Sequence, residues 1–129
     1  MAKVTKTKIR LTATDLEKFH HKQQSIESLD TIRGVADALR PVISALMTLG
    51  SEAGYQPEKA GLYALFVGGG LILRLEDLCD AHDLTFDEAW AQHLGDFEVL
   101  PPGLRDRLVR CYENIVDAVA TDTPEFEPF

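Results

Sequence analysis

The feature that most limits how this chain can fold is an uncharged run in its middle. Residues 60–73, AGLYALFVGGGLIL, are fourteen consecutive positions without a charged side chain, and they include the triplet Gly68-Gly69-Gly70. A helix that spans a membrane needs about 20 apolar residues, so this run is too short to cross one. It predicts instead a helix that is buried at the centre of a helical domain.

The glycines of this run predict both a close helix contact and a weak point. Gly61 lies seven residues before Gly68, about two helical turns, so both face the same way and would let another helix approach closely. Each glycine also disfavours a helix by about 1 kcal/mol relative to alanine. We therefore expect a bend or an interruption at residues 68–70. One alternative is a self-associating structural protein, a homodimer formed through the helix that contains Gly61 and Gly68.

The composition fits a single folded domain. Of the 129 residues, 45% are hydrophobic and 26% are charged, values close to the globular average and far from those of disordered chains. This length allows one core without disulfides or a structural metal. The first residues, MAKVTKTKIRLT, lack the apolar region of a secretory signal, so we expect a cytoplasmic protein with no membrane partner.

Apolar residues at helical spacing predict helices on both sides of the central run. Residues 29–46 carry one apolar stripe with steps of three and four, and residues 104–120 carry another. Pro41 lies inside the first stripe and lacks a backbone donor, so we expect a kink or a break there. Gly50 stands where a left-handed cap would end that helix, and Pro57 stands where the central helix would begin.

Two Thr-x-x-Glu sequences predict where two further helices begin. Thr14 and Glu17 would form a capping box for a helix that begins at Asp15. Thr85 and Glu88 would form the second box, for a helix that ends before a glycine ten residues later. Together these patterns predict an all-α fold, a single-domain bundle of five to six helices.

The two ends of the chain are predicted to lie outside the bundle. Residues 1–13 form a basic N-terminal arm whose loose alternation fits either a flexible segment or one short strand. Since no second strand-like run is present, such a strand would have to pair with another chain. Residues 14–121 are the expected helical domain. Residues 122–129 form an extended acidic and aromatic tail, in which Phe126 and Phe129 either pack on the domain or dock elsewhere.

The net charge of −8 arises in one window of the sequence. Residues 75–104 contain eight acids and no Lys or Arg, whereas the rest of the chain contains thirteen acids and thirteen bases. An acidic surface repels phosphate and attracts a basic partner over a long range. The alternative is a solvated surface that only keeps a small protein in solution. The acids of the window are Glu76, Asp77, Asp80, Asp83, Asp87, Glu88, Asp96 and Glu98.

The leading functional hypothesis places a binding surface in this window. We expect the acids of two neighbouring helices to hold and block a basic site on another protein, as an inhibitor, an antitoxin or an accessory regulator does. An aromatic side chain among them would add an anchor if it is exposed. The candidate partner-binding residues are Glu76, Asp80, Asp83, Asp87, Glu88 and Trp90.

The order of elements over residues 71–94 also fits a helix-turn-helix motif. In that motif the second helix enters the major groove of DNA with its first residues at the bases. Here that helix would begin with Phe86-Asp87-Glu88, and it contains no Lys or Arg. Because two carboxylates would meet the phosphates at the point of contact, we expect no nucleic-acid partner.

The segment LRLEDLCDAHDLTFDEAWAQHL, residues 73–94, is similar to the C-terminal helices of all-helical nucleotide pyrophosphohydrolases. The resemblance implies carboxylates in two Glu-rich helical motifs that hold magnesium on a nucleotide phosphate. It covers about one sixth of the chain, and glycines and leucines occupy residues 68–73, where the second acidic motif would fall. We therefore transfer no site residue, and a carboxylate-metal enzyme of this type stays an alternative.

Few residues of the sequence point to catalysis or metal binding. Glu76 and Asp80 share a helical face and suit magnesium or calcium, but no second carboxylate pair has matching spacing. Cys79 and Cys111 lie within apolar helical patterns, as buried free thiols do, and no Cys-x-x-Cys motif is present. The glycine triplet lacks the Lys and the Ser or Thr of a phosphate-binding loop. We expect a non-enzymatic protein without a metal or a cofactor.

Overall fold

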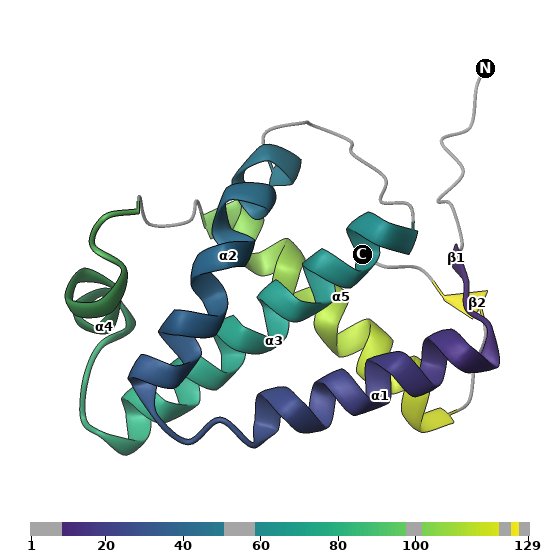
Figure 1. Cartoon of the computed structure of the whole chain (residues 1–129), viewed down its shortest axis with the longest axis horizontal. Coiled ribbons are helices and arrows are strands. Elements are labelled where there is room, and N and C mark those ends of the chain that lie inside the picture. Colours follow the sequence, from purple (N-terminus) through teal and green to yellow (C-terminus); the bar gives the residue numbers. More distant parts are fainter. Residues whose placement is uncertain (1–8, 51–58, 98–101, 122–124, 127–129) are drawn as a thin grey trace.

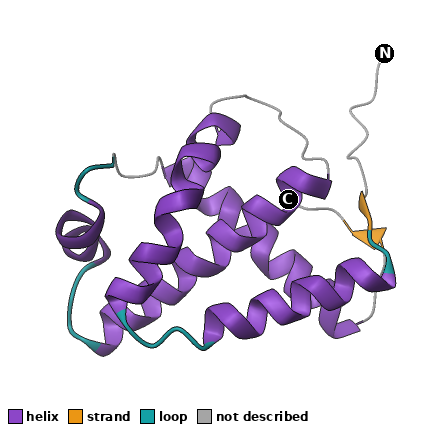
Figure 2. Ribbon diagram, in the orientation of Figure 1, coloured by secondary structure: helices purple, strands orange, loops and turns teal. Residues whose placement is uncertain are grey.

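Most of the described residues lie in helices (Figures 1 and 2). The computed structural model describes residues 9–50, 59–97, 102–121 and 125–126, and within these ranges there are five helices and two very short strands. The predicted all-α fold is confirmed. In chain order the elements are β1 (Ile9–Arg10), α1 (Ala13–Glu27), α2 (Ile32–Gly50), α3 (Lys59–Ala81), α4 (Phe86–Leu94), α5 (Pro102–Thr121) and β2 (Glu125–Phe126).

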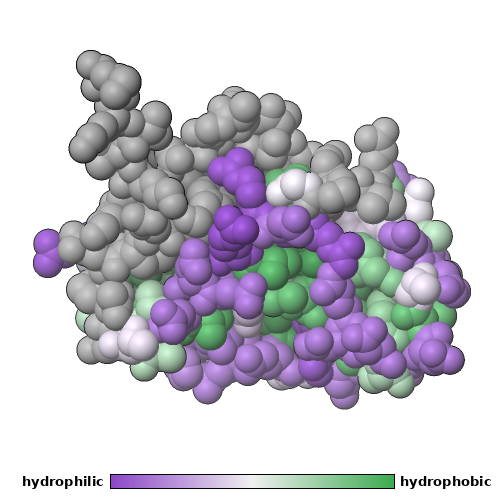
Figure 3. All heavy atoms as spheres, turned by 180° about the vertical axis from the view of Figure 1, so that it is seen from behind, coloured by the Kyte–Doolittle hydropathy of each residue, from purple (hydrophilic) through white to green (hydrophobic). Residues whose placement is uncertain are grey.

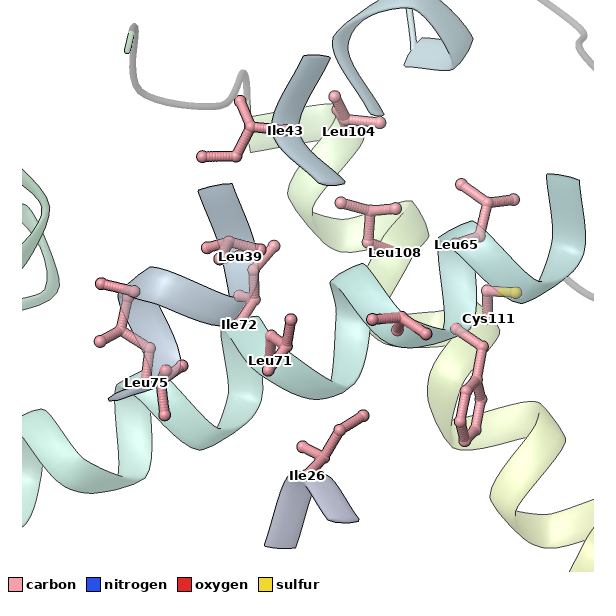
Figure 4. Packing of buried hydrophobic residues seen from close by; sticks show 14 of the residues in the cluster. Ile26, Leu39, Ile43, Leu65, Leu71, Ile72, Leu75, Leu104, Leu108 and Cys111 are labelled. Carbon is pink, nitrogen blue, oxygen red and sulfur yellow. The ribbon is translucent and has the colours of Figure 1, made fainter. Parts of the chain in front are cut away.

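The central helix is α3, as the uncharged run predicts. It packs against each of the other four helices, and most of its apolar side chains are buried. Side chains from α1, α2, α3 and α5 meet in one core, which Figure 4 shows with ten of them labelled. Each large apolar side chain that is fully buried contributes about 1.5–3 kcal/mol relative to an exposed one. In the part of the chain that is described, no helix has the length and hydrophobicity needed to cross a membrane.

The glycine triplet does not interrupt α3, so the predicted break at residues 68–70 is wrong. A Cβ on Gly69 would overlap the backbone carbonyl oxygen of Leu108 in α5, and one on Gly70 would lie 2.6 Å from Cε2 of Tyr112. The absence of side chains therefore lets α5 pack directly on α3, and the apolar area buried by this contact offsets the poor helix propensity of glycine. The close contact with another helix is made by Gly69 and Gly70 within one chain, not by the predicted pair Gly61 and Gly68. The homodimer through Gly61 and Gly68 stays a prediction.

The helix α2 also continues where the sequence predicts a break. It runs from Ile32 to Gly50 through Pro41, whose ring is exposed. The residues on either side, Leu39 and Ile43, are buried in the core. A proline inside a helix costs about 3 kcal/mol, and burial of the apolar stripe maintains the helix against that cost. The predicted start at Pro57 lies outside the described residues.

The N-cap of α1 is Thr12, two residues before Thr14, the cap that the sequence predicts. Its Oγ1 accepts a hydrogen bond from the Asp15 backbone N–H (3.1 Å), and the Asp15 carboxylate accepts one from the Thr12 N–H (2.9 Å). This reciprocal arrangement is a capping box closed by aspartate in place of glutamate. Leu11 and Leu16 occupy the two positions of a hydrophobic staple around it, and Leu11 is buried. The apolar residue before the cap thus selects Thr12 over Thr14.

The two described strands join the ends of the chain. Ile9 pairs with Phe126 and Arg10 pairs with Glu125 in an antiparallel arrangement (Figure 1). The expectation that a strand of the N-terminal arm needs another chain is therefore wrong for residues 9 and 10. A strand of two residues is too short for alternation of apolar and polar side chains to reveal it. Phe129 of the tail lies outside the described residues.

Candidate functional site

The candidate site lies at the turn between α3 and α4. Asp83 adopts a left-handed backbone conformation with a φ of 56°. The backbone N–H of Leu84 donates to the carbonyl of Cys79 (2.9 Å), and that of Asp83 donates to the carbonyl of Asp80 (3.4 Å). These bonds satisfy the last carbonyls of α3 and end the helix with a left-handed cap. The turn places the acids of the last α3 turn beside the first turn of α4.

The first turn of α4 is capped as the sequence predicts. The Thr85 hydroxyl accepts a hydrogen bond from the Glu88 backbone N–H (3.1 Å) and donates one to the Glu88 carboxylate (3.0 Å). Asp87 and Glu88 lie in this first turn, where the partial positive charge of the helix end favours carboxylates. The predicted end at Gly95 is also confirmed, because Gly95 is the C-cap of α4. Two carboxylates are therefore held at a fixed helix end.

Four of the predicted contact residues are exposed at this turn, and we call them the acidic corner. Burial raises the pKa of the Cys79 thiol, and the carboxylates of Asp80 and Glu88 raise it further. Asp80 of α3 lines the same small pocket as Thr85 and Phe86 at the start of α4, so the end of α3 and the start of α4 share this region. Among the described residues, no Lys or Arg forms an ion pair with any member of the corner. The acidic corner consists of Asp80, Asp83, Asp87 and Glu88.

Glu76, the fifth predicted acid, is engaged within the protein. Its carboxylate forms an ion pair with Arg105 of α5, and the exposed fractions of the two side chains are 32% and 33%. The guanidinium of Arg105 also lies 4.1 Å from the centre of the Phe86 ring in α4. Arg105 therefore links α3, α4 and α5 at one point. Arg105 lines one small pocket together with Asp80, and its ion pair is with Glu76.

Trp90 is a core residue, so the condition for its role as an anchor, an exposed indole, is not met. Its side chain is 1% exposed, and its Nε1–H donates to the carbonyl oxygen of Phe97 (3.2 Å). The indole also packs on Phe86, with ring centres 5.8 Å apart. Trp90 lies with Ala89 and Leu94 on the buried face of α4.

Arg40 of α2 holds the other end of α4, and sequence reasoning missed this role. Its guanidinium donates to both Asp96 carboxylate oxygens (2.8 and 3.0 Å) and to the carbonyl oxygen of His93 (2.8 Å). This hydrogen-bonded pair holds the pKa of Asp96 below its ordinary value. Because Asp96 is paired with Arg40, we do not count it as part of the acidic corner. The two residues are 56 positions apart, so no local spacing pattern could have indicated the contact.

The two cysteines are buried free thiols, as predicted. Burial raises the pKa of Cys111 to about 12, so its thiol stays protonated at neutral pH. Burial also raises the pKa of Cys79, which lies beside the acidic corner. A protonated buried thiol is a poor nucleophile. Within the described ranges, His, Cys, Asp and Glu side chains do not form groups of three that could hold a metal ion.

Comparisons with models of known protein families, with curated proteins and with solved structures found no significant match. The class of the protein is therefore defined by its own geometry. It is a small all-α domain in which one long apolar helix is surrounded by four others, with an exposed acidic corner where α3 meets α4.

Proposed function

We propose that the protein is a non-enzymatic, cytoplasmic binding protein whose acidic corner binds and blocks a basic site on a partner protein. One observation carries the proposal: Asp80, Asp83, Asp87 and Glu88 are all exposed around the turn that joins α3 to α4, and among the described residues none of them forms an ion pair with Lys or Arg. Uncompensated carboxylates attract a Lys- or Arg-rich surface from a distance and raise the rate of association.

The turn itself supports recognition because it fixes where the carboxylates lie. Asp83 is held in the left-handed position that ends α3, and the Thr85 cap fixes the first turn of α4. Backbone positions that are fixed before binding reduce the entropy that a partner must overcome. A planar guanidinium of the partner is the most favourable occupant, since it donates two parallel hydrogen bonds to one carboxylate.

A variant of the acidic corner with three fewer negative charges tests the proposal. The variant Asp80→Asn/Asp83→Asn/Asp87→Asn removes three charges, and asparagine also tolerates the left-handed conformation at position 83. We expect the partner captured from the source cells by wild-type protein to bind this variant on the order of tenfold more weakly, since each exposed ion pair contributes about 0.2–1 kcal/mol. Immobilised protein and quantitative mass spectrometry of the retained proteins measure this.

The helix α5 provides the matched control. The variant Asp106→Asn/Glu113→Gln/Asp117→Asn makes the same change in net charge at three exposed positions of α5. Capture should be unaffected by this control, and raising the salt concentration should release the partner from wild-type protein. Equal capture by all three proteins, or equal loss with both variants, would show that the acidic corner is not the binding surface.

A further inference from the structure

A groove lies between α1, α2 and α3, and none of the acidic-corner residues lines it. The helices α1 and α2 both pack on α3 and diverge from the loop that joins them (Figure 1). The groove between them has a volume of about 440 Å³. Two small residues, Ala38 of α2 and Ala64 of α3, line it where larger side chains would fill the space. Figure 3 shows the molecule from behind the view of Figure 1, where hydrophilic side chains surround an apolar area.

The floor of this groove is apolar. Ile26 of α1, Val42 of α2, and Val67 and Leu71 of α3 all line it. Val42 is partly exposed, whereas the other three are also members of the buried core. A site of this size, with a mostly apolar lining and a few polar groups at one edge, falls within the range of about 300–1,000 Å³ that small-molecule sites occupy.

The edge that α1 contributes is cationic. Lys22 lines the groove, and Lys18 lies one turn earlier on the same helix face. The Nζ of Lys18 is 4.4 Å from the centre of the Tyr63 ring, which also lines the groove. Within the described residues neither lysine forms an ion pair with an acid. A negative group that entered here would therefore meet the ammonium group of Lys22 beside an apolar floor, with the ammonium group of Lys18 over the neighbouring Tyr63 ring.

We infer that this groove binds a single-chain amphiphile with an anionic head, a fatty carboxylate. The tail lies on the floor formed by Ile26, Val67 and Leu71, and the carboxylate lies at Lys22 on the α1 edge. Charge and polarity both select this occupant: the tail matches the apolar lining and the head matches the lysines.

The first test is titration of the full-length protein with octanoate, decanoate and dodecanoate below their micelle concentrations. Full burial of one methylene group tightens binding about fourfold, so in an open groove we expect about a twofold to fourfold gain per methylene. In methyl-labelled protein, dodecanoate should shift the resonances of Val42 and Val67. Non-saturable binding, or shifts confined to residues outside the groove, would overturn the inference. So would dodecyltrimethylammonium binding as tightly as dodecanoate, because the lysine edge should disfavour a cationic head.

Two pairs of variants test the floor and the edge separately. Ala64→Phe fills the groove and should weaken dodecanoate binding at least tenfold, whereas Ala91→Phe, at an exposed position of α4, should leave it unchanged. Lys22→Gln should weaken binding about threefold at low salt, and Arg110→Gln, on α5, should not. Unchanged binding by the Ala64→Phe variant would overturn the inference. If this variant does not fold, the methyl shifts of the wild-type protein decide the question.

Light scattering tests whether a second copy of the chain occupies the groove instead. If a second copy of the chain covers the groove, the wild-type protein is a dimer, Ala64→Phe makes it a monomer, and dodecanoate does not bind. That result would overturn the inference. A wild-type protein that binds dodecanoate without a change in its mass supports it.

Discussion

Gly69 marks the place where the backbones of α3 and α5 come closest. A Cβ at this position would overlap the carbonyl oxygen of Leu108 and lie 2.7 Å from its carbonyl carbon, and a helix backbone cannot rotate away as a side chain can. Replacing Gly69 with alanine therefore forces the two helices apart. We expect the free energy of unfolding to fall by about 3 kcal/mol, measured by urea denaturation followed by circular dichroism.

Gly103, near the start of α5, is the matched control for this substitution. A Cβ there would meet no heavy atom within 4 Å. The change Gly103→Ala should raise the free energy of unfolding by up to about 1 kcal/mol, because alanine favours the helix and restricts the unfolded chain. Equal effects of the two substitutions would contradict the assignment of Gly69 to a close helix contact.

Asp83 pays a small conformational cost at the turn of the acidic corner. Its φ of 56° lies in the left-handed region, which glycine adopts without strain and which branched side chains avoid. We expect Asp83→Gly to raise the free energy of unfolding by about 0.5 kcal/mol and Asp83→Val to lower it by about 1–2 kcal/mol. Thermal denaturation of the two variants measures this difference. Equal stability of the two would mean that the turn does not keep this conformation in solution.

The helix α4 depends on its neighbours because it has only nine residues. Isolated helices shorter than about 12 residues are marginal in water, so the contacts at its two ends maintain it. Arg40 supplies one of these contacts through Asp96 and the His93 carbonyl. We expect Arg40→Gln to accelerate amide hydrogen exchange in α4 while the buried centre of α3 stays protected. Exchange measured by NMR on both proteins tests this.

Acid should reproduce the effect of that substitution. The Arg40 pair holds the pKa of Asp96 below its ordinary value of about 3.9, so its stabilising effect is present above this pH. The effect is lost as the pH falls through the lower pKa of the folded state. Exchange in α4 of the wild-type protein should therefore approach that of the Arg40→Gln variant near pH 2–3. A constant difference between the two proteins at all pH values would contradict this role of the pair.

Local sequence patterns predicted correctly which segments form helices, but they predicted two interruptions of helices that do not occur. Residues 104–120 and 86–94 form helices close to their predicted bounds, because their apolar spacing and caps are local properties. Pro41 and the triplet at 68–70 predicted interruptions that do not occur. In both cases a penalty intrinsic to the residue is outweighed by burial against other helices. The magnitude of that burial depends on the tertiary structure and cannot be read from neighbouring residues.

The acids of the candidate site divide into two groups that the sequence alone could not separate. Asp83 and Asp87 follow directly from the turn and the cap, which are local features. Glu76 and Asp96 belong to ion pairs with Arg105 and Arg40, residues that lie outside the acidic window. The absence of bases from the window therefore overstated its free negative charge. Contacts between distant helices decide which carboxylates remain available.

A thiol in the core should make the folded protein sensitive to alkali. Burial raises the pKa of Cys111 from 9.0 to about 12, so the folded state retains a proton that the unfolded state loses. The stabilisation is fully present below about pH 9 and declines as the pH rises toward 12. One such group adds a slope of about 1.4 kcal/mol per pH unit to the free energy of unfolding.

The variant Cys111→Ala isolates this contribution. It creates a small cavity that lowers the stability at every pH, but it removes the ionisation between pH 9 and pH 11. Urea denaturation across this range should give a steeper decline for the wild-type protein than for the variant. Parallel profiles would contradict the buried position of the thiol.

The pairing of β1 with β2 brings together residues that are almost the full length of the chain apart. Closing a loop of this size in an unfolded chain costs about 4 kcal/mol, far more than a ladder of two residues can return. The helices α1 and α5 pack on each other in the folded protein, and we expect this contact to form first and to bring the strands close. Proximity of the two ends should thus appear last during refolding. Energy transfer between fluorescent probes at positions 9 and 126 would show when the two strands pair, and with them when the last part of the fold forms.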